Sequence, residues 1–143
     1  MFRISKLADY AVVILAEMAK DSEALFNTSS LAAAVKLPEP TVSKVLKLLV
    51  RGDLVSSTRG INGGYRLNCA VSDITVENII IAVDGPIAIT ACVDDRVPDC
   101  SLSDCCSVRG RWDDVNTAVR NALGGVTLVD MMAQNKIEKE EVA

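Results

Sequence analysis

Four cysteines lie within fifteen residues of the chain, and their side chains are the ones best suited to metal chemistry: Cys92, Cys100, Cys105 and Cys106. Thiolates gathered on one segment bind a soft metal ion or an iron–sulfur cluster. Zinc fingers and ribbons use C-x2–4-C pairs, whereas the intervals here are C-x7-C and C-x4-C, followed directly by a further cysteine. The fifth cysteine, Cys69, stands apart and is interpreted as a small apolar residue of the interior.

The neighbours of these cysteines narrow the ligand set. Cys105 and Cys106 are adjacent, and successive side chains point apart, so one metal rarely takes both. We expect Cys92, Cys100 and Cys106 to be the ligands, with Cys105 as the second choice for the third position. The chain has no histidine, which excludes Rieske-type, Cys₂His₂ and Cys₃His sites. A fourth ligand must then come from a carboxylate, from solvent or from another subunit.

Four carboxylates share the segment with the thiols: Asp94, Asp95, Asp99 and Asp104. Repulsion between like charges predicts that the segment stays mobile until a cation binds. Three other interpretations stay open at this point. They are a zinc-stabilised loop, a thiol–disulfide switch through Cys105 or Cys106, and cysteines that bind no metal.

Hydrophobic periodicity and turn residues predict the elements that would position this segment, in a mainly α-helical chain with one β-hairpin. We expect helices at residues 6–20, 31–35, 41–52, 72–83 and 108–124, a short helix at 127–132, and strands at 54–58 and 65–67. Residues 27–30 and 72–74 are predicted to cap the second and fourth helices. The cysteines fall in a predicted loop, 87–107. A coiled-coil-like stripe follows it, made of Val108, Trp112, Val115, Val119 and Ala122.

Two short helices joined by a proline-containing turn, followed by a glycine-rich hairpin, are typical of a winged helix-turn-helix. The third helix would then enter a DNA major groove about 12 Å wide. Candidate DNA contacts lie on its exposed side, at the preceding helix and on the hairpin turn: Ser29, Pro40, Thr41, Ser43, Lys44, Lys47, Arg59, Gly60, Asn62, Gly63, Gly64 and Tyr65. Taken alone, the third helix could equally be a core helix of any small α-helical domain.

The charge distribution supports the DNA-binding interpretation. Residues 1–68 carry nine basic and six acidic side chains, whereas residues 69–143 carry six and thirteen, within a net charge of −4. A basic half on an acidic protein favours one face that meets phosphate over unspecific attraction to polyanions. Half of the residues are hydrophobic, which is rich for so short a chain and is explained if the protein oligomerises. No general acid–base set is recognisable, so an enzyme is not expected.

Three sequence segments together resemble the Rrf2 family of transcriptional regulators, most closely the branch that regulates the SUF iron–sulfur assembly genes. They are residues 3–11 (RISKLADYA), residues 59–67 (RGINGGYRL), and Cys92 and Cys100 with residues 106–112 (CSVRGRW). The resemblance covers residues 1 to about 134. It implies a homodimer that binds promoter DNA through the winged helix-turn-helix and pairs through a long C-terminal helix.

The same resemblance implies an iron–sulfur cluster on the three cysteines, with a 2Fe–2S cluster favoured over 4Fe–4S. In some relatives the fourth ligand is an acidic residue on the first helix of the partner subunit, and Asp9 stands at that position. Its alternative role is an N-terminal helix carboxylate that interacts with the helix dipole. Other relatives use a histidine just after the third cysteine, and this chain has none there.

These observations predict four regions and one function. The regions are a DNA-binding head (1–68), a connecting helix with the cysteine loop (69–107), a dimerisation helix (108–134) and a disordered tail (135–143). The function is an iron–sulfur-dependent repressor of cluster-assembly genes. A nitric-oxide- or iron-responsive repressor is the alternative, and an iron–sulfur carrier is less favoured. Because no signal peptide or membrane span is recognisable, we expect a cytoplasmic protein without a small-molecule substrate.

Overall fold

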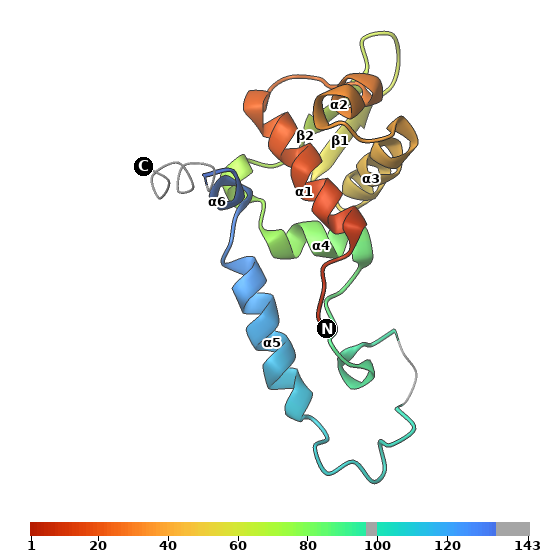
Figure 1. Cartoon of the computed structure of the whole chain (residues 1–143), viewed down its shortest axis with the longest axis vertical. Helices are drawn as coiled ribbons and strands as arrows, with labels where there is room; N and C mark the ends of the chain where they lie inside the picture. The colour runs from red at the N-terminus through yellow and green to blue at the C-terminus, as the bar shows by residue number, and fades with distance from the viewer. Residues whose placement is uncertain (97–99, 134–143) are drawn as a thin grey trace.

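A computed structural model describes residues 1–96 and 100–133 of the chain. It is mainly α-helical, with one antiparallel hairpin in which Val55 pairs with Leu67 and Thr58 with Gly64. The elements follow the predicted order along the chain (Figure 1): α1 (Lys6–Met18), α2 (Thr28–Val35), α3 (Glu39–Arg51), β1 (Val55–Thr58), β2 (Gly64–Leu67), α4 (Val76–Asp84), α5 (Arg111–Gly124) and α6 (Leu128–Ala133). Short 3₁₀ turns lie at Ala19–Asp21, Val71–Asp73 and Ala91–Val93.

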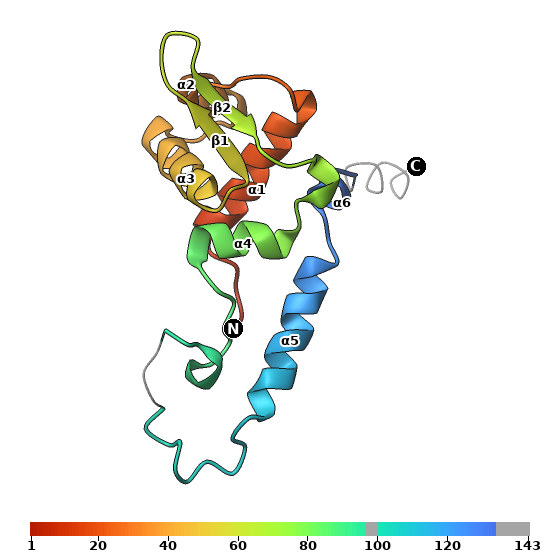
Figure 2. The same cartoon turned by 180° about the vertical axis from the view of Figure 1, so that it is seen from behind.

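The molecule consists of a rounded head and an arm. Helices α1 to α4 and the hairpin form the head, and α5 extends away from it with the cysteine-bearing segment at its far end (Figure 1). Seen from behind, the hairpin lies beside α3, and α6 returns to the head next to the start of α4 (Figure 2). The DNA-binding candidates and the cysteines therefore lie at opposite ends of the molecule.

The core of the head is built from the apolar faces of its helices. Fully buried side chains recur at helical spacing on α1 and α3: Ile14, Leu15, Met18, Val42, Val45, Leu46 and Leu49. Ile74, Ile79 of α4 and Leu128 of α6 are also fully buried in the same cluster. The core therefore continues beyond residue 68, where we expected the head to end, because residues after the hairpin supply part of its apolar surface.

The helix-turn-helix forms for local reasons. Asn27 caps α2, since its Oδ1 accepts the N–H of Ser30 at 2.7 Å. Residues 28–30 consequently form the first turn of α2, three residues before the predicted start. Lys36 takes a left-handed conformation with φ 57°, which ends α2. Helix α3 starts at Glu39, two residues earlier than predicted, because Pro40 needs no N–H partner in a first turn.

Two further helix starts differ from the predictions. Helix α4 is capped by Thr75, not by residues 72–74: the Thr75 hydroxyl accepts the N–H of Asn78, whose side chain accepts the N–H of Thr75. Helix α5 starts at Arg111 instead of residue 108, because Gly110 before it adopts a positive φ of 76°. The predicted disordered tail, 135–143, and the aspartate at position 99 lie outside the described residues.

Candidate functional site

The exposed face of α3 forms a shallow groove of about 500 Å³. Its lining residues recur at helical spacing: Pro40, Ser43, Lys44, Lys47, Leu48 and Arg51. The opposite face of the helix is fully buried, so the amphipathic pattern holds this face outward. Lys44 and Lys47 are exposed, and neither forms an ion pair with any side chain in the described part of the chain. Two free cations on one helix face can meet the phosphates that border a groove.

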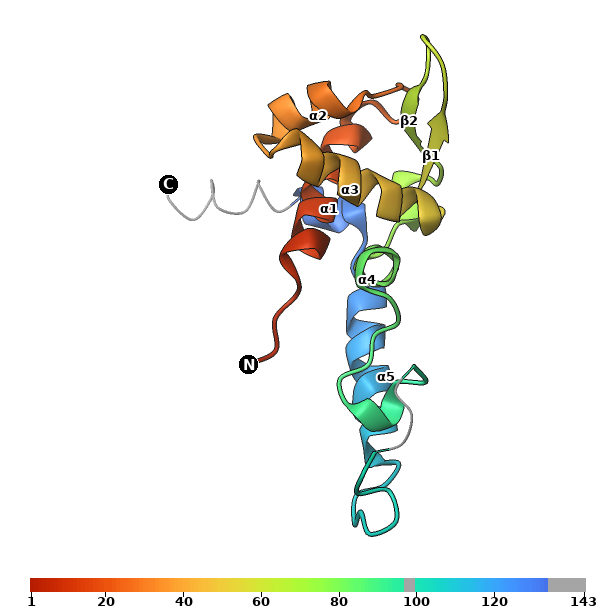
Figure 3. The ribbon, with the colours of Figure 1, turned by 90° about the vertical axis from the view of Figure 1, so that its right-hand side faces the viewer.

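The hairpin turn places a second set of exposed candidates beyond the sheet, where it projects past α2 and α3 (Figure 3). Arg59, Gly60 and Asn62 are exposed there. Gly60 has a φ of 108°, a conformation that favours glycine. At Gly63 a β-carbon would lie 2.1 Å from the carbonyl oxygen of Thr58, so only glycine fits. The glycines thus let the turn close tightly and present the arginine at its edge.

Other predicted DNA contacts have visible structural tasks. Tyr65 is half-buried, packs against the core and pairs with Phe26 through two backbone hydrogen bonds of 2.8 Å. Gly64 allows that pairing, because a β-carbon there would lie 2.7 Å from the Phe26 carbonyl oxygen. Thr41 is half-buried and does not line the α3 groove. Ser29 is exposed in the first turn of α2, where its hydroxyl donates to the side chain of Asn27 at 3.1 Å.

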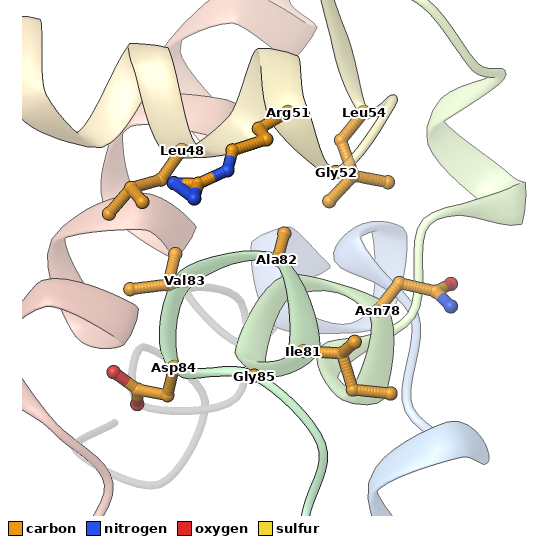
Figure 4. A pocket seen from close by; sticks show the side chains of 10 residues that line it. All are labelled: Leu48, Arg51, Gly52, Leu54, Asn78, Ile81, Ala82, Val83, Asp84 and Gly85. Carbon is orange, nitrogen blue, oxygen red and sulfur yellow. The ribbon is translucent and has the colours of Figure 1, made fainter. Parts of the chain in front are cut away.

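Helix α3 contacts α4 at its C-terminal end, beside a cavity of about 540 Å³ (Figure 4). Leu48 and Arg51 line both this cavity and the α3 groove, whereas Ile81, Val83 and Asp84 line it from α4. Gly52, the residue after α3, lies close to α4, because a β-carbon there would lie 2.5 Å from the β-carbon of Ala82. The end of α3 is therefore in direct contact with α4.

At the far end of the arm, the three predicted ligands line one cavity of about 720 Å³: Cys92, Cys100 and Cys106. Cys92 lies in the 3₁₀ turn Ala91–Val93, with its Sγ 3.1 Å from the Thr90 hydroxyl oxygen. Cys105 is exposed and does not line the cavity. All five cysteines are free thiols. The structure thus brings the three preferred cysteines around one space and leaves the adjacent one outside.

The thiols surround this cavity without forming a closed ligand set. Among residues 1–96 and 100–133, no three Cys, Asp or Glu side chains lie close enough together to hold one metal ion. The donor chemistry suits a soft metal or an iron–sulfur cluster, so the cysteine segment would have to contract around it. Asp9 is exposed in the first turn of α1 and does not line the cavity of its own chain.

One of the loop carboxylates already has a cationic partner. The guanidinium of Arg96 donates two hydrogen bonds of 2.8 Å to Asp94, and the Arg96 backbone N–H donates a third at 3.0 Å. The side-chain bonds first, and then the backbone bond, hold the pKa of Asp94 below its ordinary value. The predicted repulsion among carboxylates and thiolates is therefore partly compensated at Asp94. Arg96 also donates to the Pro86 carbonyl at 3.4 Å, next to the end of α4.

Two polar side chains of α5 that sequence reasoning did not single out tie the arm together. The amide of Asn116 bonds to the backbone of Ile87 and Ile89, at 3.0 Å each. The guanidinium of Arg120 donates to Glu77 of α4 at 2.8 Å. An asparagine among the valines of the predicted stripe was the available signal. Within that stripe Trp112 and Val115 remain 41% and 44% exposed, which leaves an apolar surface for a partner.

A comparison with protein-family models decides the family. The model described as "Rrf2: Iron-dependent Transcriptional regulator" matches residues 4–134 of this chain. The chain belongs to the Rrf2 family. The resemblance seen in the sequence is thereby confirmed at the level of the family.

Named relatives and solved structures agree with this Rrf2 assignment. "Protein aau3" of Rhizobium meliloti is 31% identical over 91% of this chain and 84% of its own. The structure of CymR, "the Global Cysteine Regulator of B. subtilis", is 29% identical, with a TM-score of 0.69 over 94% of this chain and 98% of its own. The structure of T. potens IscR is 25% identical, with a TM-score of 0.64 over 94% and 88% of the two chains.

These likenesses establish the coarse function of this Rrf2 protein. It is a DNA-binding transcriptional regulator and not an enzyme, and its fold is the predicted winged helix-turn-helix. Within the part of the chain that the structure describes, every helix is too short or too polar to cross a bilayer.

Proposed function

We propose that this Rrf2 protein is an iron–sulfur-dependent repressor of iron–sulfur cluster-assembly genes, with Cys92, Cys100 and Cys106 as cluster ligands. The observation that carries the proposal is that these three thiols line one cavity at the start of α5, whereas Cys105 does not. A 2Fe–2S cluster is preferred to 4Fe–4S on the family resemblance. When bound, the cluster supplies iron centres that three thiolates share and that oxidant or iron shortage removes.

The head would read promoter DNA with α3 in the major groove and the hairpin turn beside it. Support comes from Lys44 and Lys47 on one face of α3, which are exposed and form no ion pair within the described residues, together with the exposed Arg59 on the turn. Two heads in a symmetric dimer would meet half-sites about one helical turn, ~34 Å, apart. The remaining residues of the proposed interface contact DNA or hold these elements in shape: Ser29, Pro40, Thr41, Ser43, Gly60, Asn62, Gly63, Gly64 and Tyr65.

A second copy of the chain would pair along α5 and complete the cysteine site. The apolar surface at Trp112 and Val115 is exposed on a single chain, and a partner helix would bury it. Asp9 of the partner subunit is the proposed fourth ligand. Its exposure in the first turn of α1, away from the cavity of its own chain, is compatible with a ligand given across a dimer.

The contacts within one chain offer a route from the arm to α3. When the three thiols draw the cysteine segment together, the start of α5 and the segment after α4 are pulled with it. The Arg120–Glu77 ion pair joins α5 to α4, and the close approach of Gly52 to Ala82 joins α4 to α3. The tilt of the two α3 helices, and hence their fit to the operator, would follow the state of the cysteines.

Metal and sulfide analysis of protein purified without oxygen tests this proposal. We expect iron and acid-labile sulfide with thiolate-to-iron absorption, and an electron-resonance signal after reduction. Serine at position 92, 100 or 106 should abolish the iron, while Cys105→Ser serves as the matched control and should keep it. Affinity for the protein's own upstream DNA should change when the iron is removed. Oxygen-free protein without iron or labile sulfide would overturn the cluster assignment.

A thiol-based regulator without a cluster is the second candidate. Among the described residues no set of metal ligands is assembled. In addition, the chain is 29% identical to CymR, the global cysteine regulator of B. subtilis. In that case Cys105 or Cys106 would respond by oxidation. This candidate would be favoured if the DNA affinity of metal-free protein changed on thiol oxidation. The change should then be absent in Cys105→Ser or in Cys106→Ser.

A further inference from the structure

We infer that Asn116 is the positioning residue of the cysteine site. Its side-chain amide binds the backbone of residues 87–89, just before Cys92, to helix α5. It thereby sets where the thiol of Cys92 lies relative to that of Cys106. The inference rests on the proposed role of the three cysteines as ligands, and Asn116 itself would not be a ligand. It acts through the backbone that carries Cys92.

The geometry around Asn116 is specific. Its side chain is the single buried polar one among the described residues, with 9% of its surface exposed. Its Oδ1 accepts the backbone N–H of Ile89, and its Nδ2 donates to the backbone carbonyl of Ile87, both at 3.0 Å. This is the pair of bonds that a neighbouring β-strand would make with the same two residues. An amide supplies the donor and the acceptor in one plane, which an aliphatic side chain cannot do.

The consequence is that two ligand candidates depend on one helix. Cys106 is joined to the start of α5 by tight turns, since Arg109 N–H bonds to the Cys106 carbonyl and Arg111 N–H to that of Val108. Cys92 follows Ile89 by three residues, and its 3₁₀ turn packs against α5. Asn116 therefore links the backbone that leads to Cys92, the first ligand candidate, to the helix that follows Cys106, the last one.

Residues that orient metal ligands without touching the metal contribute through preorganisation. Replacing such a residue costs roughly 10- to 100-fold in metal affinity. If Asn116 has this role, its loss should release the backbone at 87–92 and weaken thiolate binding together, while the head stays intact. A residue that merely filled space would be replaceable by an apolar side chain of similar size.

The test compares full-length wild-type protein with Asn116→Ala and Asn116→Leu, the second of which keeps the branched shape of the side chain without the amide. Asn121→Ala is the matched control, because Asn121 is exposed on the same helix. Amide hydrogen exchange is measured residue by residue. Metal affinity is measured with Co²⁺ under anaerobic, reducing conditions, where thiolate–cobalt absorption reports ligation, and iron content is measured in parallel.

Both variants at position 116 should exchange the Ile89 amide roughly tenfold faster than wild type, as expected for about 1.4 kcal/mol of lost hydrogen bonding. Co²⁺ affinity should fall by roughly tenfold. The Leu46 amide in α3 and all properties of Asn121→Ala should stay at wild-type values. Wild-type exchange at Ile89, or wild-type Co²⁺ affinity despite faster exchange, would overturn the inference while leaving the proposed function standing. Wild-type protein that binds neither Co²⁺ nor iron would instead refute the proposed function, and the ligand-positioning role with it.

Discussion

The contact between α3 and α4 yields the sharpest prediction. In Gly52→Ala the added methyl would lie 2.5 Å from the β-carbon of Ala82, more than about 1 Å inside ordinary carbon–carbon contact. Overpacking of this kind costs about 1–3 kcal/mol. Gly52 has φ −87° and ψ 8°, a conformation that alanine adopts freely. The substitution also lowers the conformational entropy of the unfolded chain, which stabilises the folded protein by about 0.4–1 kcal/mol and offsets part of the cost. The net expectation is a protein destabilised by about 1–2 kcal/mol, with α3 displaced from α4.

A double-mutant cycle separates the clash from other effects. Ala82→Gly alone should cost about 0.5–1 kcal/mol, as for glycine inside a helix. In the double variant the methyl of residue 52 enters the space vacated at residue 82, so the combined loss should be at least about 1 kcal/mol smaller than the sum. The matched control is Gly125→Ala, since Gly125 has a similar conformation (φ −82°, ψ −9°) and its added β-carbon would come no nearer than 3.3 Å to another atom, the carbonyl oxygen of Asn121.

Free energies of unfolding from denaturant titration, with DNA affinity measured alongside, decide the matter. We expect Gly52→Ala to weaken DNA binding and Ala82→Gly to restore part of it, because the second change lets α3 return. Strict additivity, within about 0.3–0.5 kcal/mol, would show that the two residues do not press on each other. The route from arm to α3 proposed above would then lose its last link.

Three further outcomes are expected. Lys44→Gln should reduce the dependence of log affinity on log salt by about 0.9 per lost phosphate contact, or about 1.8 for two protomers, whereas the exposed Lys20→Gln should leave the salt slope unchanged; equal slopes would remove Lys44 from the interface. Thr75→Ala breaks the capping box of α4 and should lower the free energy of unfolding by about 1 kcal/mol, seen as an earlier denaturant midpoint. Hydrogen bonds from the backbone and then the hydroxyl of Thr127 lower the pKa of Asp130 below 3.8, so this carboxylate stabilises the fold above that pH and the contribution disappears as the pH falls through its folded pKa. Asp130→Asn should flatten the acid limb of the stability curve, and an unchanged limb would contradict the assignment.

The head could be predicted from the sequence because local signals agree there. The apolar residues of α3 recur at helical spacing, and the glycines of the hairpin turn occupy positions that require them. The errors fall mainly at helix starts: one capping side chain decides the boundary of α2 and of α4, whereas Pro40 and Gly110 decide those of α3 and α5. Asn27 and Thr75 cap α2 and α4. Asn27 is followed by three more polar residues, and Thr75 comes two residues after Asp73, so the pattern alone does not choose among several possible caps.

The site was predicted less completely, for a different reason. Cysteine spacing indicated three thiols, and the structure places those three around one cavity. Asn116 and Gly52 escaped notice because their tasks depend on partners far along the chain: Ile87 and Ile89 for the first, and Ala82 for the second. Periodicity describes which side of a helix is apolar, but it does not say which distant backbone that side will meet. The compensation of Asp94 by Arg96 was missed although the two are near neighbours, because hydrogen-bond geometry cannot be read from spacing.

The way the arm is joined to the head has a consequence for how such proteins can diversify. Thr75, just before α4, and Thr127, just after α5, pair through their backbones as a short antiparallel bridge, so the two ends of the segment that includes the arm lie together at the head. Two backbone hydrogen bonds hold these chain segments side by side: the N–H of Val76 donates to the carbonyl of Val126 at 2.9 Å, and that of Leu128 to the carbonyl of Ile74 at 2.8 Å. Because loop-closure entropy grows slowly with length, residues beyond α4 can be lengthened, shortened or given other ligands at little cost to the DNA reader. The same DNA-binding head can therefore be combined with segments that bind different ligands.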